Sequence, residues 1–228
     1  EVWEDLQGRD VVFLSWRDTR NPEGGGAELY LEKIATGLVA RGCRVTVFTA
    51  AYAGAPDDEV VGGIRYVRRG GKLSVYAEGM RALRRGDLGD PDVVVDVQNG
   101  LPFFTRLVTR KPVTVLVHHV HREQWPVVYP GPTGRLGWWL ESRFSPWLYR
   151  RSRYVAVSQA TRGELAELGE RVVDLLVAEA IRELRQDAPG QGDVRGVHVD
   201  VGAGCERLHD GLEGVRRQKR RLIGASPN

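Results

Sequence analysis

The chain has 228 residues, of which 42% are hydrophobic and 28% are charged, so it is long enough to bury a sizeable core. No apolar run reaches the roughly 20 residues that cross a bilayer, and the first residues lack a secretory signal pattern, which predicts a cytoplasmic protein. The net charge of +3 is too small to indicate nucleic acid, but it fits a phosphorylated small molecule or an anionic membrane surface. Cys43 and Cys205 match no metal spacing, and reduced thiols are expected.

The first predicted unit is a strand at residues 11–16, a loop that ends in Gly24, Gly25 and Gly26, and a helix that begins at Ala27. This order indicates the start of a Rossmann-like α/β domain. Three glycines let the backbone approach a ligand without Cβ clashes, and the free N–H groups of the following helix attract phosphate or carboxylate. A flexible turn without a ligand is the alternative, because the loop is longer than the GxGxxG turn of dinucleotide folds.

The chain then alternates between predicted strands and helices. The helix from Ala27 ends at Arg41 and Gly42, and the short spacing to the next strand predicts a right-handed crossover between neighbouring parallel strands. The next predicted elements are a strand at 45–49, a loop at 51–63, a strand at 64–69 and a helix at 75–85.

Two further apolar runs, at residues 93–97 and 113–117, are continuous rather than alternating, which is typical of central strands buried on both faces. Polar residues that follow these runs include Asn99, His118, His119 and His121. The carboxyl ends of parallel strands line the ligand crevice of an open sheet, so these side chains are candidates for ligand binding. Three nearby histidines also suggest a metal, but neighbours on an extended chain point to opposite sides, and hydrogen bonding to a ligand is the favoured interpretation.

The segment at residues 122–154 is rich in aromatic side chains and contains four prolines, which predicts a loop and one or two helices rather than one long helix. Core packing is the favoured interpretation for Trp138, Trp139 and Trp147. The alternative is an amphipathic element that faces a membrane. The arginines that would then lie near headgroups are Arg150, Arg151 and Arg153.

The last predicted strand, at residues 155–157, leads into a helix capped by Ser158 or Thr161. The polar start of this helix again follows the carboxyl end of a strand. The predicted fold is therefore an α/β domain with one parallel sheet flanked by helices. Its strands are at 11–16, 45–49, 93–97, 113–117 and 155–157.

The order and spacing of these motifs over residues 8–169 resemble the N-terminal domain of a retaining glycosyltransferase of family 4. The matching stretches are NPEGGGAE, RGCRVTVFTA, PDVVVDVQNGLPFFT, KPVTVLVHHVHREQW and YVAVSQATRGEL. In that family two Rossmann-like domains form the GT-B fold; the first binds mostly the acceptor, the second binds mostly the nucleotide sugar, and no metal is required. The resemblance implies transfer of a hexose from a nucleotide sugar to an acceptor hydroxyl with retention of the anomeric configuration. The acceptor is expected to be a small molecule or a lipid-linked molecule, and no cofactor is expected. Peripheral contact with the inner membrane face is an option.

The resemblance also implies roles for single residues. The family's glycine loop near the sugar and diphosphate corresponds to residues 24–26, and Glu28 opens the helix that follows. Its cleft histidine corresponds to His118, which is expected to hydrogen-bond the transferred sugar as a catalytic residue. The positions that border the same cleft, less specifically, correspond to Asn99 and Ser158.

After residue 169 the sequence departs from the family pattern. Residues 170–189 and 197–208 resemble parts of the donor domain, but the strand with a phosphate-binding arginine, the lysine that follows it and a later pair of glutamates have no counterpart. The expected domains are an acceptor-binding domain at 1–169 and a partial donor domain with a basic tail at 170–228. Either the chain is truncated and internally deleted, or it joins fragments. It is expected to have no transferase activity by itself; the alternative function is a noncatalytic α/β module that binds a phosphorylated small molecule.

Overall fold

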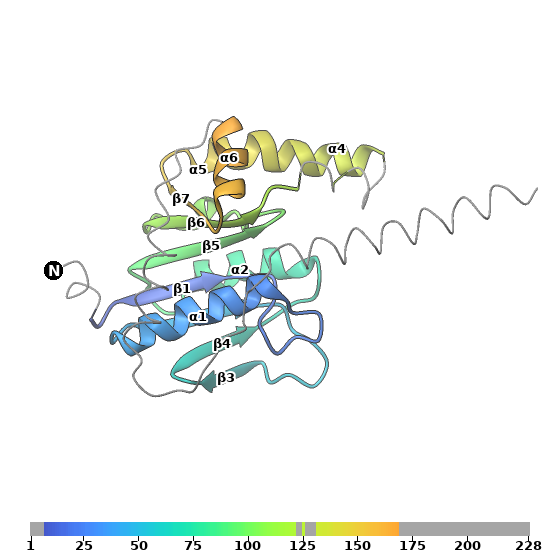
Figure 1. The fold of residues 1–228 in the computed structure, drawn as a ribbon. Coiled ribbons are helices and arrows are strands. Elements are labelled where there is room, and N and C mark those ends of the chain that lie inside the picture. The colour runs from blue at the N-terminus through green and yellow to red at the C-terminus, as the bar shows by residue number, and fades with distance from the viewer. Residues whose placement is uncertain (1–6, 122–124, 126–130, 169–228) are drawn as a thin grey trace, which may run out of the picture. The chain divides into compact units, whose positions relative to one another are not determined.

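A seven-stranded sheet organises the part of the chain that the computed structural model describes, residues 7–121, 125 and 131–168 (Figure 1). These residues all fall in one compact unit. The strand order is β3-β4-β2-β1-β5-β6-β7. The expected partial donor domain at 170–228 lies outside the described residues, and so does Cys205, whereas Cys43 is a buried free thiol.

All neighbouring strands of the sheet pair in parallel except β3, which is antiparallel to β4 at one edge. The strands are β1 (Asp10–Leu14), β2 (Arg44–Thr49), β3 (Asp58–Val61), β4 (Ile64–Arg68), β5 (Val93–Asn99), β6 (Val113–His119) and β7 (Arg153–Ala156). The register places Val11 opposite Val45 on β2 and Val93 on β5. The predicted parallel sheet is therefore confirmed.

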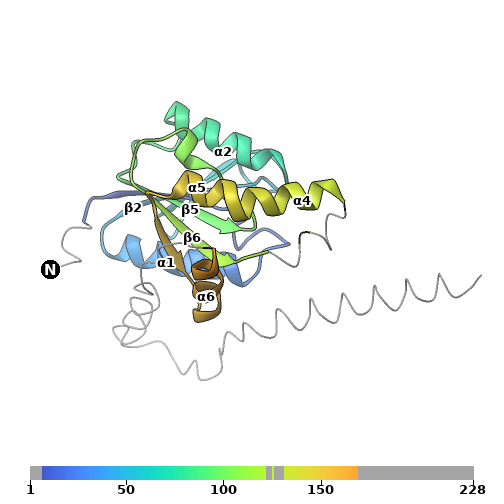
Figure 2. The same cartoon turned by 90° about the horizontal axis from the view of Figure 1, so that it is seen from above.

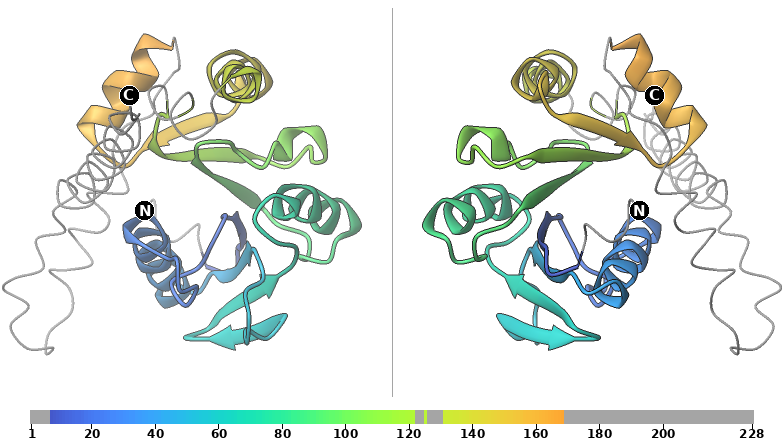
Figure 3. Two further views of the ribbon diagram at one scale, coloured as in Figure 1. Left: turned by 90° about the vertical axis from the view of Figure 1, so that its right-hand side faces the viewer. Right: turned by 90° about the vertical axis from the view of Figure 1, so that its left-hand side faces the viewer.

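Helices cover both faces of the sheet. They are α1 (Gly26–Ala40), α2 (Ser74–Arg85), the 3-10 turn η2 (Thr105–Leu107), α4 (Pro132–Trp139), the π-helical segment η3 (Leu140–Phe144), α5 (Ser145–Tyr149) and α6 (Gln159–Glu167). Helices α1 and α6 lie on one face, whereas α2 and the run from α4 to α5 lie on the other (Figures 2 and 3). The result is a three-layer α/β sandwich.

The core has one hydrophobic cluster on each face of the sheet, as expected for strands that are buried on both sides. Along β1, Val12 and Leu14 enter the cluster beneath α2, and Val11 and Phe13 enter the cluster beneath α1. At about 1.5 to 3 kcal/mol for each fully buried large apolar side chain, these alternating positions fix the register of the sheet.

Strand β3 corrects the prediction that residues 51–63 form a loop. Its four residues pair with β4 through a tight turn at Gly62 and Gly63, which have φ values of 58° and 79°. Two consecutive positive φ values are typical of a type I′ hairpin turn, which glycine adopts without strain. The strand is at the edge of the sheet and leaves Val60 exposed, so it lacks the apolar pattern of the central strands.

The helical run at residues 132–149 agrees with the one or two helices predicted for this segment, whereas most of the predicted loop before it, residues 122–124 and 126–130, lies outside the described residues. α4, η3 and α5 follow one another without a break, and Leu140 and Ser145 at the junctions keep right-handed helical dihedral angles. Pro146 lies at the start of α5, directly after the π-helical segment, where a missing N–H is best tolerated. Core packing is confirmed for Trp138 but is wrong for Trp139 and Trp147, which are exposed.

Candidate functional site

The carboxyl edge of the sheet brings the predicted site residues together. The glycine loop lies between β1 and α1, Asn99 ends β5, His118 lies near the end of β6, and Ser158 follows β7. Because β1, β5, β6 and β7 are mutually parallel, these four positions share one edge. Helix α1 and the end of β6 are in direct contact at this edge, because the rings of Tyr30 and His118 pack edge to face with centroids 5.5 Å apart.

His118 is largely buried and has an unused ring nitrogen. Its Nε2 atom is shielded from solvent and has no hydrogen-bond partner among the described residues. Burial lowers the pKa of His118 to about 4, so the imidazole is neutral at neutral pH. A neutral imidazole offers one donor and one acceptor, and a buried polar atom without a partner favours a ligand that supplies one.

The glycine loop is held in shape by the polar residue at its start, Asp18. Its Oδ1 atom accepts hydrogen bonds from the backbone N–H groups of Arg20 (2.9 Å) and Asn21 (3.1 Å), and Gly24 N–H donates to the carbonyl of Asn21 at 2.7 Å. A Cβ atom on Gly24 would lie 2.8 Å from the Asp18 carbonyl oxygen and 2.9 Å from that of Asn21. The turn is therefore tight rather than flexible, and Gly24 is required by close backbone contact.

A buried ion pair fixes the glycine loop to the sheet. Arg68, at the end of β4, is fully buried, and its Nε atom donates to Asp18 Oδ2 at 2.6 Å. The same guanidinium donates to Glu59 on β3 at 2.7 Å. Both Asp18 and Arg68 escaped the sequence analysis, since no local pattern links residues that are 50 positions apart.

Glu28 closes the start of α1 as a capping box. Its Oε2 atom accepts the N–H of Gly25 at 2.7 Å, and the side chain is buried against the loop. The N–H groups of Gly24 and Gly25 are thus used within the protein, whereas that of Gly26 has no acceptor in the described part of the chain. Of the three glycines, Gly26 is the one whose N–H is available to a ligand at the helix N-terminus.

Ser158 and Thr161 connect α6 to the end of β6. The Ser158 hydroxyl oxygen accepts the N–H of Thr161 at 3.1 Å, which confirms Ser158 as the cap of this helix. Thr161 Oγ1 donates to the carbonyl of His118 at 3.0 Å, so the cap also fixes the backbone that carries the histidine. On the neighbouring strand, a bulge between Gln98 and Asn99 brings Asn99 opposite His119.

Glu141, which lies on the π-helical segment η3, is a buried acid that the sequence analysis missed. Its carboxylate accepts the backbone N–H of His121 at 3.0 Å and the indole N–H of Trp125. Trp125 in turn lies so close to Gly137 that a Cβ there would be 2.4 Å from the indole ring. These contacts tie the chain that follows β6 to the helical run, and a π-helical turn at such a point is common near functional sites.

Burial raises the pKa of Glu141 to about 7, although hydrogen bonds from Trp125, the His121 backbone and Gln98 act to lower it. The folded state therefore holds a proton that the unfolded state releases above its ordinary pKa of 4.5. The contribution of this group is most favourable below pH 4.5, and stability is lost as the pH rises towards 7. A shift of this size amounts to about 3 kcal/mol.

We expect Glu141→Gln to remove that loss. Unfolding by urea between about pH 4.5 and pH 8 should show the wild type losing about 3 kcal/mol relative to the variant as the pH rises. The comparison isolates Glu141, because burial lowers the pKa of both His118 and His121 to about 4 and their contribution rises with pH in both proteins. Parallel stability curves for the two proteins would contradict the raised pKa.

The three clustered histidines do not converge on one point. His119 and His121 have ring centroids 4.9 Å apart, whereas His118 packs against α1. His121 Nδ1 lies 3.9 Å from Glu141 Oε1, too far for a hydrogen bond, and the lowered pKa of His121 leaves it uncharged at neutral pH. Within the described ranges, no three His, Cys, Asp or Glu side chains are grouped to hold a metal ion.

Comparison with known protein families identifies the family to which this chain belongs. The family model described as Glycosyltransferase Family 4 matches residues 24–174. The chain belongs to glycosyltransferase family 4. A search of curated proteins gave no match. The matched region begins at the last turn of the glycine loop and includes His118 and Ser158, so the family relationship covers the candidate site of this family 4 domain.

A hollow of about 270 Å³ lies beside the glycine loop of the family 4 domain. Trp16, Tyr52 and Lys72 line it together with the loop itself, and Ala50 and Ala51 after β2 form part of its wall. The Trp16 indole N–H donates to the Lys72 carbonyl at 3.0 Å, which fixes the ring. The hollow lies at the carboxyl ends of β1 and β2 and therefore adjoins the candidate site.

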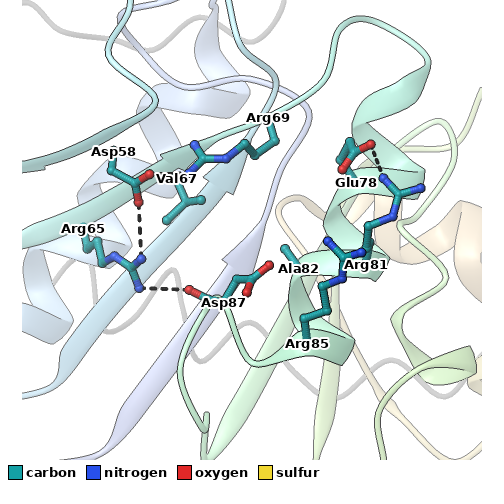
Figure 4. Close-up of a pocket in the computed structure, with 9 residues that line it drawn as sticks. All are labelled: Asp58, Arg65, Val67, Arg69, Glu78, Arg81, Ala82, Arg85 and Asp87. Carbon is teal, nitrogen blue, oxygen red and sulfur yellow. Dashed lines mark hydrogen bonds and ion pairs between the residues drawn. The ribbon is translucent and has the colours of Figure 1, made fainter.

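A second hollow, of about 380 Å³, lies between β4 and α2 and contains none of the predicted site residues (Figure 4). Arg65 and Arg69 both pair with Asp58, and Arg81 pairs with Glu78 (Figure 4 shows the Arg65 and Arg81 pairs). These opposite charges offset one another within the wall. The larger hollow of the family 4 domain is therefore separate from the candidate site at the carboxyl edge of the sheet.

Proposed function

We propose that this family 4 domain is the acceptor-binding half of a retaining hexosyltransferase, which moves a hexose from a nucleotide sugar to an acceptor hydroxyl. The observation that carries the proposal is the unpartnered, buried Nε2 atom of His118 at the edge where the glycine loop and α1 begin. In the reaction, the bond from the anomeric carbon to the diphosphate oxygen breaks, a bond to the acceptor oxygen forms on the same face, and the proton of the acceptor hydroxyl passes to the departing diphosphate.

The described residues support distinct contributions to that transfer. A neutral His118 can donate or accept a hydrogen bond with a sugar hydroxyl without adding charge to the cleft. Gly26 and the N-terminus of α1 offer an N–H group and a positive dipole end to the departing diphosphate. Asn99 and Ser158 border the cleft, and Ser158 acts there through its cap on α6.

The hollow beside the glycine loop is proposed to hold the acceptor. Trp16 and Tyr52 supply aromatic surface that can pack on a sugar ring or another flat apolar group, and Lys72 supplies positive charge, whereas the charge of Arg17 is offset by its ion pair with Glu23. These residues suit an acceptor that combines an apolar or cyclic body with an anionic group. The acceptor hydroxyl would then approach the edge occupied by the glycine loop and His118.

In an enzyme that carries this domain with a complete donor domain, we expect His118→Ala to lower kcat about tenfold, which corresponds to one hydrogen bond that strengthens in the transition state. Nucleoside diphosphate release under saturating substrates measures the effect, and proton NMR of the first product reports its anomeric configuration. His118→Asn, which retains a side-chain donor, should recover part of the loss. An unchanged kcat would remove His118 from the mechanism, and an inverted product would exclude retention.

We also propose that residues 1–228 alone transfer no sugar measurably. Family 4 members hold the diphosphate with an arginine and a lysine of the donor domain, and charge-assisted contacts of this kind contribute about 1.5 to 3 kcal/mol each. Loss of both would weaken donor binding about a hundredfold or more. Calorimetric titration with several nucleotide sugars tests this, and micromolar binding by the chain would show that the donor site is misplaced.

A further inference from the structure

The outward face of the helical run α4–η3–α5 carries large apolar side chains that the core does not use. Trp139 and Trp147 are 51% and 59% exposed, and Leu136 is 56% exposed. The inward face of the run is formed by Gly134, Gly137, Glu141, Ser145 and Tyr149. The buried positions of the run therefore include neither Trp139 nor Trp147, and both tryptophans lie on the outward side of the helix.

The two exposed tryptophans are joined by the half-buried ring of Phe144 into one continuous row. Phe144 stacks on Trp139 with ring centroids 5.9 Å apart, and its ring also contacts those of Trp147 at 5.9 Å and Phe104 at 5.7 Å. In an uninterrupted α-helix, residues eight apart are rotated by about 80° from one another. The wider turn of η3 reduces that rotation and brings both tryptophans into contact with Phe144. We call Trp139, Phe144 and Trp147 the aromatic row.

Within residues 131–151, the helical run that carries the aromatic row has exposed positive charges and no exposed negative charge. The basic residues of the run and its end are Arg135, Arg143, Arg150 and Arg151, all of which are exposed. Glu141 is the only acidic residue between positions 131 and 151, and its side chain is buried on the inward face. The Arg150 guanidinium lies 5.3 Å from the Trp147 ring centroid, so charge and aromatic surface belong to the same face.

We propose that this face is a docking surface for a membrane that contains anionic lipids. Tryptophan prefers the headgroup level of a bilayer, and arginines beside it attract anionic headgroups. The aromatic row can therefore insert at the boundary between headgroups and acyl chains while the arginines contact the anionic headgroups. The described residues contain no helix long and apolar enough to span a bilayer, so the contact is peripheral. The face occupies one side of a single helical run and differs from the grooves that bind single-stranded nucleic acid.

The docking surface is linked to the candidate site through the inward face of the same helix. Glu141 accepts the N–H of His121, which follows the end of β6, while Asp96 on β5 accepts the hydroxyl of Tyr149. Both contacts fix the helical run to the strands that end at the site. A domain docked in this way holds the carboxyl edge of its sheet at a fixed distance from the lipid surface.

Sedimentation with vesicles of phosphatidylcholine and phosphatidylglycerol tests the aromatic row. We expect the wild type to bind and its tryptophan fluorescence to shift to shorter wavelength. Trp139→Ser combined with Trp147→Ser should lower the partition coefficient at least about tenfold, because two indole rings lose their burial at the interface. The matched control is Val60→Ser combined with Leu73→Ser, which removes two exposed apolar side chains elsewhere and should leave binding unchanged.

The arginines are tested by the same assay. Arg143→Ser combined with Arg150→Ser should weaken binding to the anionic vesicles about tenfold or more, and the loss should shrink at high salt. Arg84→Ser combined with Arg85→Ser removes the same charge from the exposed end of α2 and serves as the control. Vesicles of phosphatidylcholine alone should bind the wild type weakly.

Several results would overturn the proposal. Equal vesicle binding by the wild type and the aromatic-row variant would assign the interaction to another part of the chain, and absence of binding to anionic vesicles would exclude a lipid surface. Binding of a single-stranded oligonucleotide that depends on the same side chains, without vesicle binding, would assign the face to nucleic acid. A dimer in analytical ultracentrifugation that the aromatic-row variant dissociates would assign it to a second copy of the chain.

Discussion

Arg68→Met is expected to lower the free energy of unfolding by about 3 to 5 kcal/mol, because it leaves the carboxylate of Asp18 buried without its partner. Both side chains of the pair are almost completely shielded from water, and the Nε to Oδ2 distance is 2.6 Å. Chemical denaturation of the chain measures the loss. The glycine loop should also open more often, which faster amide hydrogen exchange over residues 18–25 would report.

The matched control for this prediction is Arg65→Met on the same strand. Arg65 pairs with Asp58 at 3.3 Å, and both side chains are more than two-fifths exposed, so the pair contributes at most about 1 kcal/mol. Asp18→Asn combined with Arg68→Met should cost less than the sum of the single changes, because no charge then remains buried alone. Equal effects of Arg65→Met and Arg68→Met would contradict the buried pair.

The sequence predicted the central part of the fold because the central strands carry their own signal. β1, β2, β5 and β6 are runs of valine, leucine and phenylalanine, and burial on both faces keeps those runs continuous. β3 has no such run: its sequence is DEVV, and it pairs only through a hairpin turn at the edge of the sheet. The Gly62–Gly63 pair is a hairpin signal, but the four residues before it, two of them acidic, are too few to indicate a strand on their own.

The positions of the site residues were also predictable from topology, but the residues that support them were not. Gly24 lies in the loop that follows β1 and His118 lies near the end of β6, so the strand order alone places them at one edge. Asp18 reaches Arg68 across 50 positions, and Tyr149 reaches Asp96 across 53. Such partners meet only in the folded state, and the charge of each residue taken alone indicates exposure.

The tryptophans were misplaced for a related reason. Hydrophobicity assigns Trp139 and Trp147 to the core, but the buried positions of α4 are Gly134 and Gly137, and a Cβ on Gly137 would already lie 2.4 Å from the Trp125 ring. The π-helical segment η3 then alters the periodicity from which the buried face of a helix is usually deduced. The prediction of burial thus followed from the residue type of these tryptophans, whereas their position around the helix determines their exposure.

Asp96→Asn is expected to cost about 3 kcal/mol of unfolding free energy. The carboxylate is fully buried on β5 and accepts the N–H of Phe103 (2.7 Å), the N–H and hydroxyl of Thr105 (3.2 and 2.8 Å) and the hydroxyl of Tyr149. An amide replaces one acceptor oxygen with an NH₂ group that faces donors, so at least one of these groups is left unsatisfied at about 1 to 3 kcal/mol each. Thermal and urea unfolding measure the cost.

Asp96→Asn is also expected to disturb the outward face of the helical run. Asp96 accepts hydrogen bonds from Tyr149 of α5 and from the backbone of Phe103, and the next residue, Phe104, packs against Phe144. Asp92→Asn is the control, since Asp92 accepts the N–H of Asp10 and forms only an exposed ion pair with Arg9 at 3.5 Å, with its own side chain 40% exposed, and the change should cost less than about 1 kcal/mol. Tyr149→Phe removes one donor and should cost about 1 kcal/mol.

Burial raises the pKa of Asp96, against the hydrogen bonds that lower it, and a carboxyl that is already protonated in the fold would resemble an amide. Wild-type stability of Asp96→Asn would therefore mean that Asp96 carries a proton and donates one of these hydrogen bonds itself.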